Sequence, residues 1–234
     1  MKRWLLVALA ALGTAGLIAL GVWQLERRVW KLALIERVEQ RVHAPPVAAP
    51  GPAQWPGINR ENSEYLHVTA TGHFLPGHQT LVRAVTEQGG GYWVMAPFET
   101  ESGFVVLVNR GFVPPGWHEP TPAAPTPPAA GPTEISGLLR ISEPKGAFLH
   151  ANAPAEDRWY SRDVAAISQT QKLTGTAPYF IDAGKNAADE SAGGPIGGLT
   201  VISFRNSHLS YALTWFGLAL MVAFFGVRIA RHPQ

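Results

Sequence analysis

Two long apolar segments, one near each end of the sequence, constrain its fold more than any other feature. Residues 4–23 form a run of 20 residues without a charge, and residues 209–227 form a second run of 19. At a helical rise of about 1.5 Å per residue, each run can cross a hydrocarbon core of about 30 Å. Because backbone polar groups in lipid have to be satisfied internally, both runs are predicted to be transmembrane helices.

A cleaved signal peptide is the alternative for the first run, with Lys2 and Arg3 as its charged start. The run is longer than the roughly 7–15 apolar residues of a signal core, and no small-residue cleavage site follows it, so an uncleaved anchor is favoured. No Arg- and Ser-rich presequence stands ahead of the run. This favours a bacterial protein over an imported mitochondrial one.

The charges around the two runs disagree about orientation. Arg228 and Arg231 follow the second run and indicate a cytoplasmic C-terminus, whereas basic residues after the first run outnumber Lys2 and Arg3 before it. Short tails weigh more than long domains in this rule, so we expect both termini in the cytoplasm of a bacterium and the main domain in its periplasm. The predicted division is a membrane helix over residues 1–25, an extracytoplasmic domain over 26–206, a second membrane helix over 207–229 and a cytoplasmic tail over 230–234.

The sequence between the apolar runs predicts a β-rich domain with at least one helix. An amphipathic helical stalk is predicted to continue from the first run and to end before Pro45. Alternation of apolar and polar residues, or short apolar runs, then predicts strands. We expect a membrane protein of the α+β class, in which two transmembrane helices flank a mostly antiparallel β domain, built as a sandwich or partial barrel. The predicted strands lie near residues 65–73, 79–86, 92–98, 104–108, 135–141 and 179–182, with a helix over 162–173.

Several local features refine this prediction. Gly89–Gly91 is expected to form a hairpin or tight loop, and residues 104–108 are expected to be buried on both faces. Residues 109–114 are expected to close that apolar run. The segment 114–132 contains eight prolines and is predicted to be a surface loop. Arg110 is either a buried arginine that bridges strands, the favoured interpretation, or a partner-binding group.

Composition excludes several classes of function. The chain has no cysteine, which removes disulfides, thiol redox chemistry and thiolate metal sites. The net charge is only +2 and the basic residues are scattered, so no nucleic-acid partner is expected. Recognisable nucleophile arrangements are absent from the sequence, so the chain is not expected to be an enzyme. His67 and His73 would lie about 20 Å apart on one strand face, too far for one metal ion.

His208, at the outer mouth of the second membrane helix, is the main candidate for a binding residue. Imidazole is a standard axial ligand of haem iron, and offsets of three and seven would place Tyr211 and Trp215 on its helix face. An interfacial histidine bonded to lipid headgroups is the alternative. Aromatic and basic residues at the same membrane level could hold a flat macrocycle and its carboxylates, or could only anchor the helices. These residues are Trp23, Arg27, Arg28 and Arg205.

Small residues could let the two membrane helices approach closely. Ala11, Ala15 and Ala19 form one such stripe, and Ala219 and Ala223 form another. In a sequence this rich in alanine, the stripes are a weak signal for helix packing.

The chain resembles the Surfeit locus protein 1 (Surf/Shy) family of accessory proteins for cytochrome c oxidase assembly. The resemblance spans nearly the whole chain, from the N-terminal helix end to the start of the C-terminal helix. Each motif is short, and their order and placement at both helix ends carry the resemblance. Phe112 stands where the family commonly has tryptophan after Arg-Gly, and the proline-rich loop is specific to this sequence. The motifs are Gly21-Val-Trp23-Gln24-Leu-Glu-Arg27, Trp30-Lys31, Gly72-His-Phe74, Val108-Asn-Arg-Gly-Phe-Val-Pro114, Gly137-Leu-Leu-Arg140, Trp159-Tyr160, Gly198-Leu-Thr200 and Asn206-Ser-His208-Leu-Ser-Tyr211-Ala-Leu-Thr-Trp215-Phe216.

The resemblance implies an assembly factor for haem-copper cytochrome c oxidase that binds haem a as cargo and assists its insertion into subunit I. His208 would be the axial ligand of the haem iron, and Trp215 would lie beside the ring. Subunit I, haem a synthase and the lipid bilayer are the expected partners. The alternative is a membrane scaffold that binds subunit I or the haem synthase without holding haem.

Overall fold

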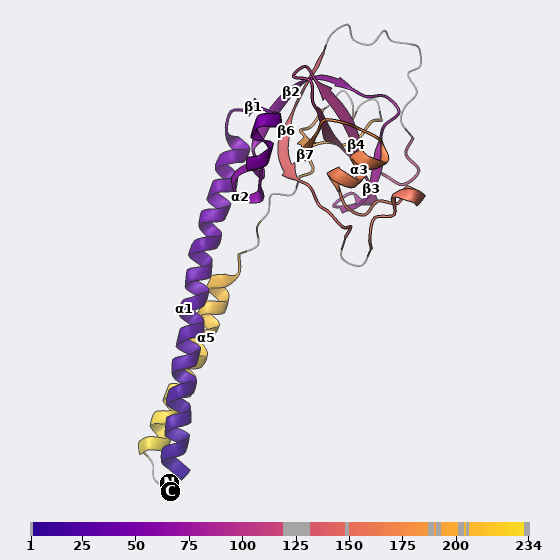
Figure 1. Cartoon of the computed structure of the whole chain (residues 1–234). Helices are drawn as coiled ribbons and strands as arrows, with labels where there is room; N and C mark the ends of the chain where they lie inside the picture. The colour runs from indigo at the N-terminus through magenta and orange to yellow at the C-terminus, as the bar shows by residue number, and fades with distance from the viewer. Residues whose placement is uncertain are drawn as a thin grey trace. The chain divides into compact units, whose positions relative to one another are not determined.

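The structure, a computed structural model, describes residues 2–118, 132–147, 150–186, 190, 193–200, 204 and 206–231. The chain separates into two compact units (Figure 1). The first unit combines Met1–Glu39 with Ile202–Gln234, and the second contains Gln40–Val201. The units are therefore a helical unit built from both ends of the chain and a central unit that contains the sheet.

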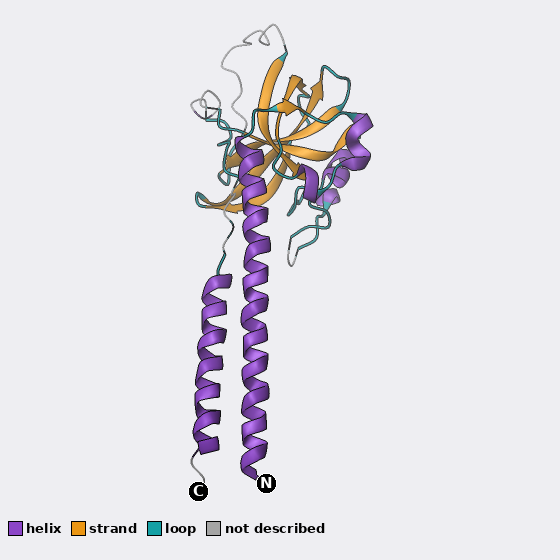
Figure 2. Cartoon of the chain, turned by 90° about the vertical axis from the view of Figure 1, so that its left-hand side faces the viewer, coloured by secondary structure: helices purple, strands orange, loops and turns teal. Residues whose placement is uncertain are grey.

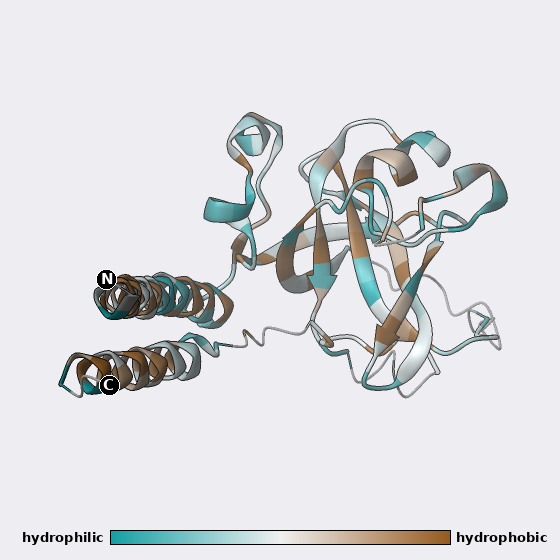
Figure 3. Ribbon diagram, turned by 90° about the horizontal axis from the view of Figure 1, so that it is seen from below, coloured by the Kyte–Doolittle hydropathy of each residue, from teal (hydrophilic) through white to brown (hydrophobic). Residues whose placement is uncertain are grey.

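The helical unit contains α1 (Lys2–His43) and α5 (His208–Arg231), which run antiparallel (Figures 1 and 2). Both helices are long and apolar enough to cross a membrane, as the two apolar runs predict. The view coloured by hydropathy shows long apolar stretches on both (Figure 3). The predicted stalk is continuous with the first apolar run in a single helix, and α1 ends just before Pro45, whose ring cannot continue a helix. Arg3 donates to the carbonyl of Ala230 and so satisfies an orphan acceptor in the last turn of α5.

The central unit contains a seven-stranded sheet and short helices (Figure 2). Six of its strands match the predicted ones in place and extend most of them by a few residues, and β1 is a short strand that was not predicted. The strands are β1 (Val47–Ala48), β2 (His67–Phe74), β3 (Thr80–Thr86), β4 (Gly89–Thr100), β5 (Val105–Val113), β6 (Thr133–Ile141) and β7 (Thr176–Ala183). The short helices are η1 (Pro52–Gly57), α2 (Arg60–Ser63), η2 (Pro154–Glu156) and α3 (Val164–Thr170).

The sheet closes on itself as a barrel. β2 pairs with β6, β6 with β7, β7 with β5 and β5 with β4, and β4 then pairs back with β2. Closure removes the exposed edges of these strands, and β3 and β1 are added outside it, on β4 and β2. β5–β7 and β1–β2 are parallel and the other pairings are antiparallel, so the prediction of a mostly antiparallel domain is confirmed. At the closing pair, a Cβ on Gly72 would overlap the carbonyl of Glu99, which explains a glycine there.

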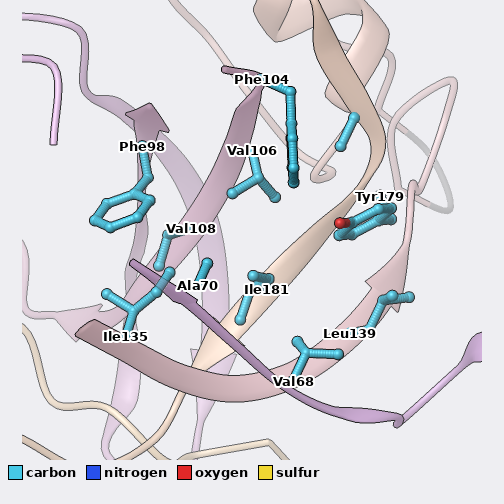
Figure 4. Close-up of a cluster of buried hydrophobic side chains, with 11 residues drawn as sticks. Val68, Ala70, Phe98, Phe104, Val106, Val108, Ile135, Leu139, Tyr179 and Ile181 are labelled. Carbon is cyan, nitrogen blue, oxygen red and sulfur yellow. The ribbon is translucent and has the colours of Figure 1, made fainter. Parts of the chain in front are cut away.

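Strand β5 is buried on both faces because the barrel wall separates two apolar clusters. Val106 and Val108 point into the barrel, where they pack with Phe98, Tyr179 and residues of every strand that closes it (Figure 4). Leu107 points to the other side. There it joins the outer cluster, which covers the barrel wall with α3. The prediction that residues 104–108 are buried on both faces is confirmed. The outer cluster consists of Val82, Met95, Leu107, Trp159, Val164, Ile167 and Phe180.

Two local predictions were wrong. Residues 109–113 do not close the apolar run, because they continue β5 and pair with β4, for example Phe112 with Trp93. Gly89–Gly91 is not the hairpin turn, since Glu87 and Gln88 make the turn and the three glycines begin β4. The predicted proline-rich loop falls largely on residues 119–131, which lie outside the described residues.

Candidate functional site

The facing surfaces of α1 and α5 follow a regular pattern, which we call the seam. On α1, the less exposed residues recur in alternating steps of three and four, and α5 shows nearly the same steps. This spacing keeps one face of each helix toward its partner, as in a coiled coil. The seam consists of Val7, Ala10, Thr14, Leu17, Gly21, Gln24, Arg28 and Lys31 on α1, and of His208, Ala212, Trp215, Ala219, Val222, Gly226 and Ala230 on α5.

Glycines make the closest approaches along the seam. A Cβ on Gly21 would overlap the ring of Phe216, and one on Gly226 would lie 2.9 Å from Cβ of Ala10. The predicted stripe Ala11, Ala15 and Ala19 is on an exposed face of α1 instead, whereas Ala219 is buried and Ala223 half-buried. Small residues therefore do form the contact, but on α1 they are different ones from those in the stripe.

His208 and Gln24 meet at the outer end of the seam. His208 is the first residue of α5, and its Nδ1 lies 2.8 Å from Oε1 of Gln24. An amide oxygen has no proton to donate, so this hydrogen bond requires the proton on Nδ1 of the imidazole. Nε2 then carries a lone pair, and within the described part of the chain it has no hydrogen-bond partner. Among the described residues, the ring therefore has Nδ1 in a hydrogen bond and Nε2 without a protein partner.

The seam face of α1 continues past the level of His208, the residue at which α5 begins. Arg28 and Lys31 are the next two seam positions after Gln24, about 6 Å and about 10 Å further along the helix axis. Nζ of Lys31 lies 4.8 Å from the ring centroid of Phe204. The imidazole of His208 on α5 and two cations of α1 thus lie along one seam, an arrangement suited to a metal-centred ligand that carries carboxylates.

The other predicted site residues lie elsewhere. Trp23 is 50% exposed and Tyr211 57% exposed, so both project away from the seam, whereas Trp215 is half-buried on it. Arg27 is exposed, and its guanidinium stacks on the ring of Trp30 at 4.8 Å. Arg205 lies outside the described residues. Of the seven predicted binding residues, the seam brings together His208, Trp215 and Arg28, and it adds Gln24 and Lys31.

A second polar cluster lies on the outer face of the barrel wall, next to a cavity of about 220 Å³. Asp182 is 3% exposed and accepts hydrogen bonds from Arg140 at 2.8 Å and from Arg162 at 3.0 Å. It also accepts from Asn109 and Thr200. Further hydrogen bonds join Arg140 to Glu64, and Arg162 to Glu143.

This cluster is held together by its own charges. Burial disfavours the charged guanidinium of Arg140, but the carboxylates of Asp182 and Glu64 outweigh this and hold its pKa above the ordinary value for arginine. The charged groups already satisfy one another, so they offer little to a ligand, and we interpret the cluster as structural. Arg110, for which strand bridging was favoured, is only half-buried and stacks on Phe74 at 5.4 Å. This stacking joins β5 to β2, and Arg140 of β6 likewise reaches Asp182 of β7.

The similarity to known proteins covers both helix ends and the barrel. The sequence model of the SURF1 family matches residues 11–220. The chain belongs to the SURF1 family. It is 35% identical to Surfeit locus protein 1 of Rattus norvegicus, over 99% of this chain and 77% of the rat protein. It is 36% identical to the human protein, over 88% and 71%, and 30% identical to that of Takifugu rubripes, over 95% and 94%.

In this SURF1-family chain, His67 and His73 of the barrel make ordinary polar contacts with protein groups. His67 bonds to the carbonyl of Ala44 and to the hydroxyl of Ser136, and His73 faces Glu99 at 3.2 Å. Across the residues that the structure describes, no group of three metal-ligating side chains occurs. The residues that the sequence reasoning missed are Gln24 as the partner of His208 and the charged cluster around Asp182. The alternating three- and four-residue spacing from Gly21 to Lys31 could have placed Gln24 on the face of α1 that meets α5.

Proposed function

We propose that this SURF1-family protein is a membrane-anchored assembly factor for haem-copper cytochrome c oxidase, which binds haem a and assists its insertion into subunit I. The observation that carries the proposal is the shared face of His208, Arg28 and Lys31. Family membership supports the assembly role, because the motifs that resemble the family lie at both helix ends. In the proposed role the protein presents its cargo and catalyses no covalent chemistry.

The residues at the outer end of the seam fit a haem. Nε2 of His208 supplies the nitrogen donor that haem iron takes from proteins, and half-buried Trp215 supplies an aromatic surface about two turns further along α5. Arg28 and Lys31 would receive the propionates, because charge-assisted bonds between arginine and carboxylate are strong in partly buried sites. Arg27 is a weaker candidate, because it is exposed and already stacks on Trp30.

The proposal includes a location. The antiparallel pairing of α1 and α5 puts residues 3 and 230 at the same end of the helix pair. We propose that this end faces the cytoplasm of a bacterium and that the barrel is in the periplasm, beside the subunit I that receives the haem. The relatives named above come from animals and do not test a bacterial location. Fractionation of the bacterial host would test whether the protein is in its inner membrane.

The test is an optical spectrum of the protein purified in detergent from cells that make haem a. The wild type is expected to carry a haem a band, which His208→Ala loses, while His78→Ala, a change of an exposed histidine, retains it. A colourless wild type that still co-purifies with subunit I or haem synthase would instead identify a scaffold. Equal haem content in wild type and His208→Ala would show that His208 is not the ligand.

A further inference from the structure

Gln24 is a polar side chain just beyond the apolar run of α1, and its amide oxygen contacts His208. Its Oε1 lies 2.8 Å from Nδ1 of His208, a residue 184 positions later in the chain. A polar group near hydrocarbon is costly without a hydrogen bond, so each side chain satisfies the other. The bond also selects one of the two neutral forms of imidazole, as argued above.

We propose that Gln24 is a positioning residue for His208: it fixes the Nδ1–H tautomer and the ring orientation, so that Nε2 is presented to haem iron. This inference rests on the proposed function. Metal-bound histidines generally donate their second ring N–H to a fixed acceptor, which orients the ring and raises its basicity as a ligand. Without that acceptor the free imidazole would rotate and would populate the Nε2–H form, in which the ligand nitrogen is protonated.

Close packing elsewhere on the seam means that this bond is not required to hold the helices together. Gly21 meets Phe216, Gly226 meets Ala10, and Ala212 and Ala219 are buried between the helices. A hydrogen bond at the open end of the seam adds little to this apolar contact, since interhelical hydrogen bonds in membranes contribute little stability on average. The larger effect of Gln24 is therefore on the state of the His208 ring.

Nitrogen NMR of the haem-free protein tests this inference without any haem. With ¹⁵N-labelled histidine in the full chain, neutral His208, assigned by comparison with His208→Ala, is expected to carry its proton on Nδ1. Gln24→Leu is expected to shift the signals toward the Nε2–H form, and Gln24→Glu to keep the Nδ1–H form. Thr14→Val, which removes another polar group from the seam, is the matched control and should change nothing.

Haem titration gives the second measurement. Gln24→Leu is expected to weaken haem binding by about 10–100-fold, whereas Gln24→Glu is expected to retain binding and to lower the reduction potential of the bound iron, because a carboxylate makes the imidazole more electron-rich. If the bond between Gln24 and His208 only held the helices together, the Gln24 variants would change thermal stability and leave the reduction potential of the iron unchanged. Thr14→Val is again expected to match the wild type.

The outcomes separate this inference from the proposed function. A wild type with the Nε2–H tautomer overturns the role of Gln24, whether or not haem binds. The same holds if Gln24→Leu keeps the Nδ1–H signals and full haem affinity. If the wild type shows Nδ1–H, Gln24→Leu loses it and neither protein binds haem, the orienting role stands and the haem function fails.

Discussion

Gly21 of α1 lies directly against the ring of Phe216 of α5, with no room for a side chain between them. This contact fixes the axial register of the two helices one turn below Gln24. Since Gln24 follows Gly21 by three residues, the same register brings it to His208. A packing contact between apolar residues thus sets the geometry of the polar site above it.

Gly21→Leu is therefore expected to separate the helices at their outer end. Overpacking should lower the stability of the helix pair by about 1–3 kcal/mol and should also reduce haem binding, because the bond between Gln24 and His208 would stretch. Gly16→Leu is the matched control, since no other atoms lie within 4 Å of a Cβ at Gly16. Thermal unfolding in detergent and haem titration measure both effects. Equal loss in the two variants would contradict a specific role of the contact with Phe216.

Arg28 and Arg27 are neighbours in sequence, but Arg28 lies on the seam and Arg27 is exposed, which makes them a matched pair. Arg28→Gln is expected to weaken haem binding about tenfold, because it removes a charge-assisted bond on the seam face. Arg27→Gln removes the same charge from an exposed arginine that stacks on Trp30, and should have a small effect. Haem titration at two salt concentrations checks this prediction. An equal effect of both variants would indicate that only overall charge matters.

Asp182→Asn is expected to destabilise the barrel strongly. The change leaves two half-buried guanidinium groups facing an amide, and breaking a buried ion pair costs about 3–5 kcal/mol. Glu101→Gln, at an exposed carboxylate, should stay within about 0.5 kcal/mol of the wild type. Thermal unfolding of the full chain measures the difference. If Asp182→Asn had only a mild effect, and the stability of the variant newly depended on a bound ligand, the cavity would instead be a binding site.

We expect the folded protein to lose stability at high pH because of the buried hydroxyl of Tyr179. Burial raises the pKa of its hydroxyl, which donates to the carbonyl of Pro50 at 2.8 Å. The pKa is higher in the folded state, so this stabilisation is complete below the ordinary tyrosine pKa of about 10 and falls as pH rises above it. Tyr179→Phe is expected to cost about 1 kcal/mol at neutral pH, and its deficit should shrink above about pH 10. A deficit independent of pH would contradict the prediction.

The barrel was predictable in its parts but not in its closure. Alternation in β2 and the apolar run in β5 follow from the requirement that each strand bury at least one face, so both could be recognised locally. The prediction that residues 109–114 close the apolar run was wrong for 109–113, because these residues continue β5 and pair with β4. Only the register of the sheet decides such pairing.

The sequence by itself determined that two apolar helices bracket a β-rich domain and that His208 stands where the second helix begins. These are local properties, since hydrophobic length and periodicity depend on neighbours along the chain. Only the tertiary structure decided that Gln24 is the partner of His208, that Arg28 rather than Arg27 shares its face, and that Arg140 and Arg162 converge on Asp182. Such pairs join residues far apart in sequence, and their meeting depends on helix register and barrel closure, which no local pattern specifies.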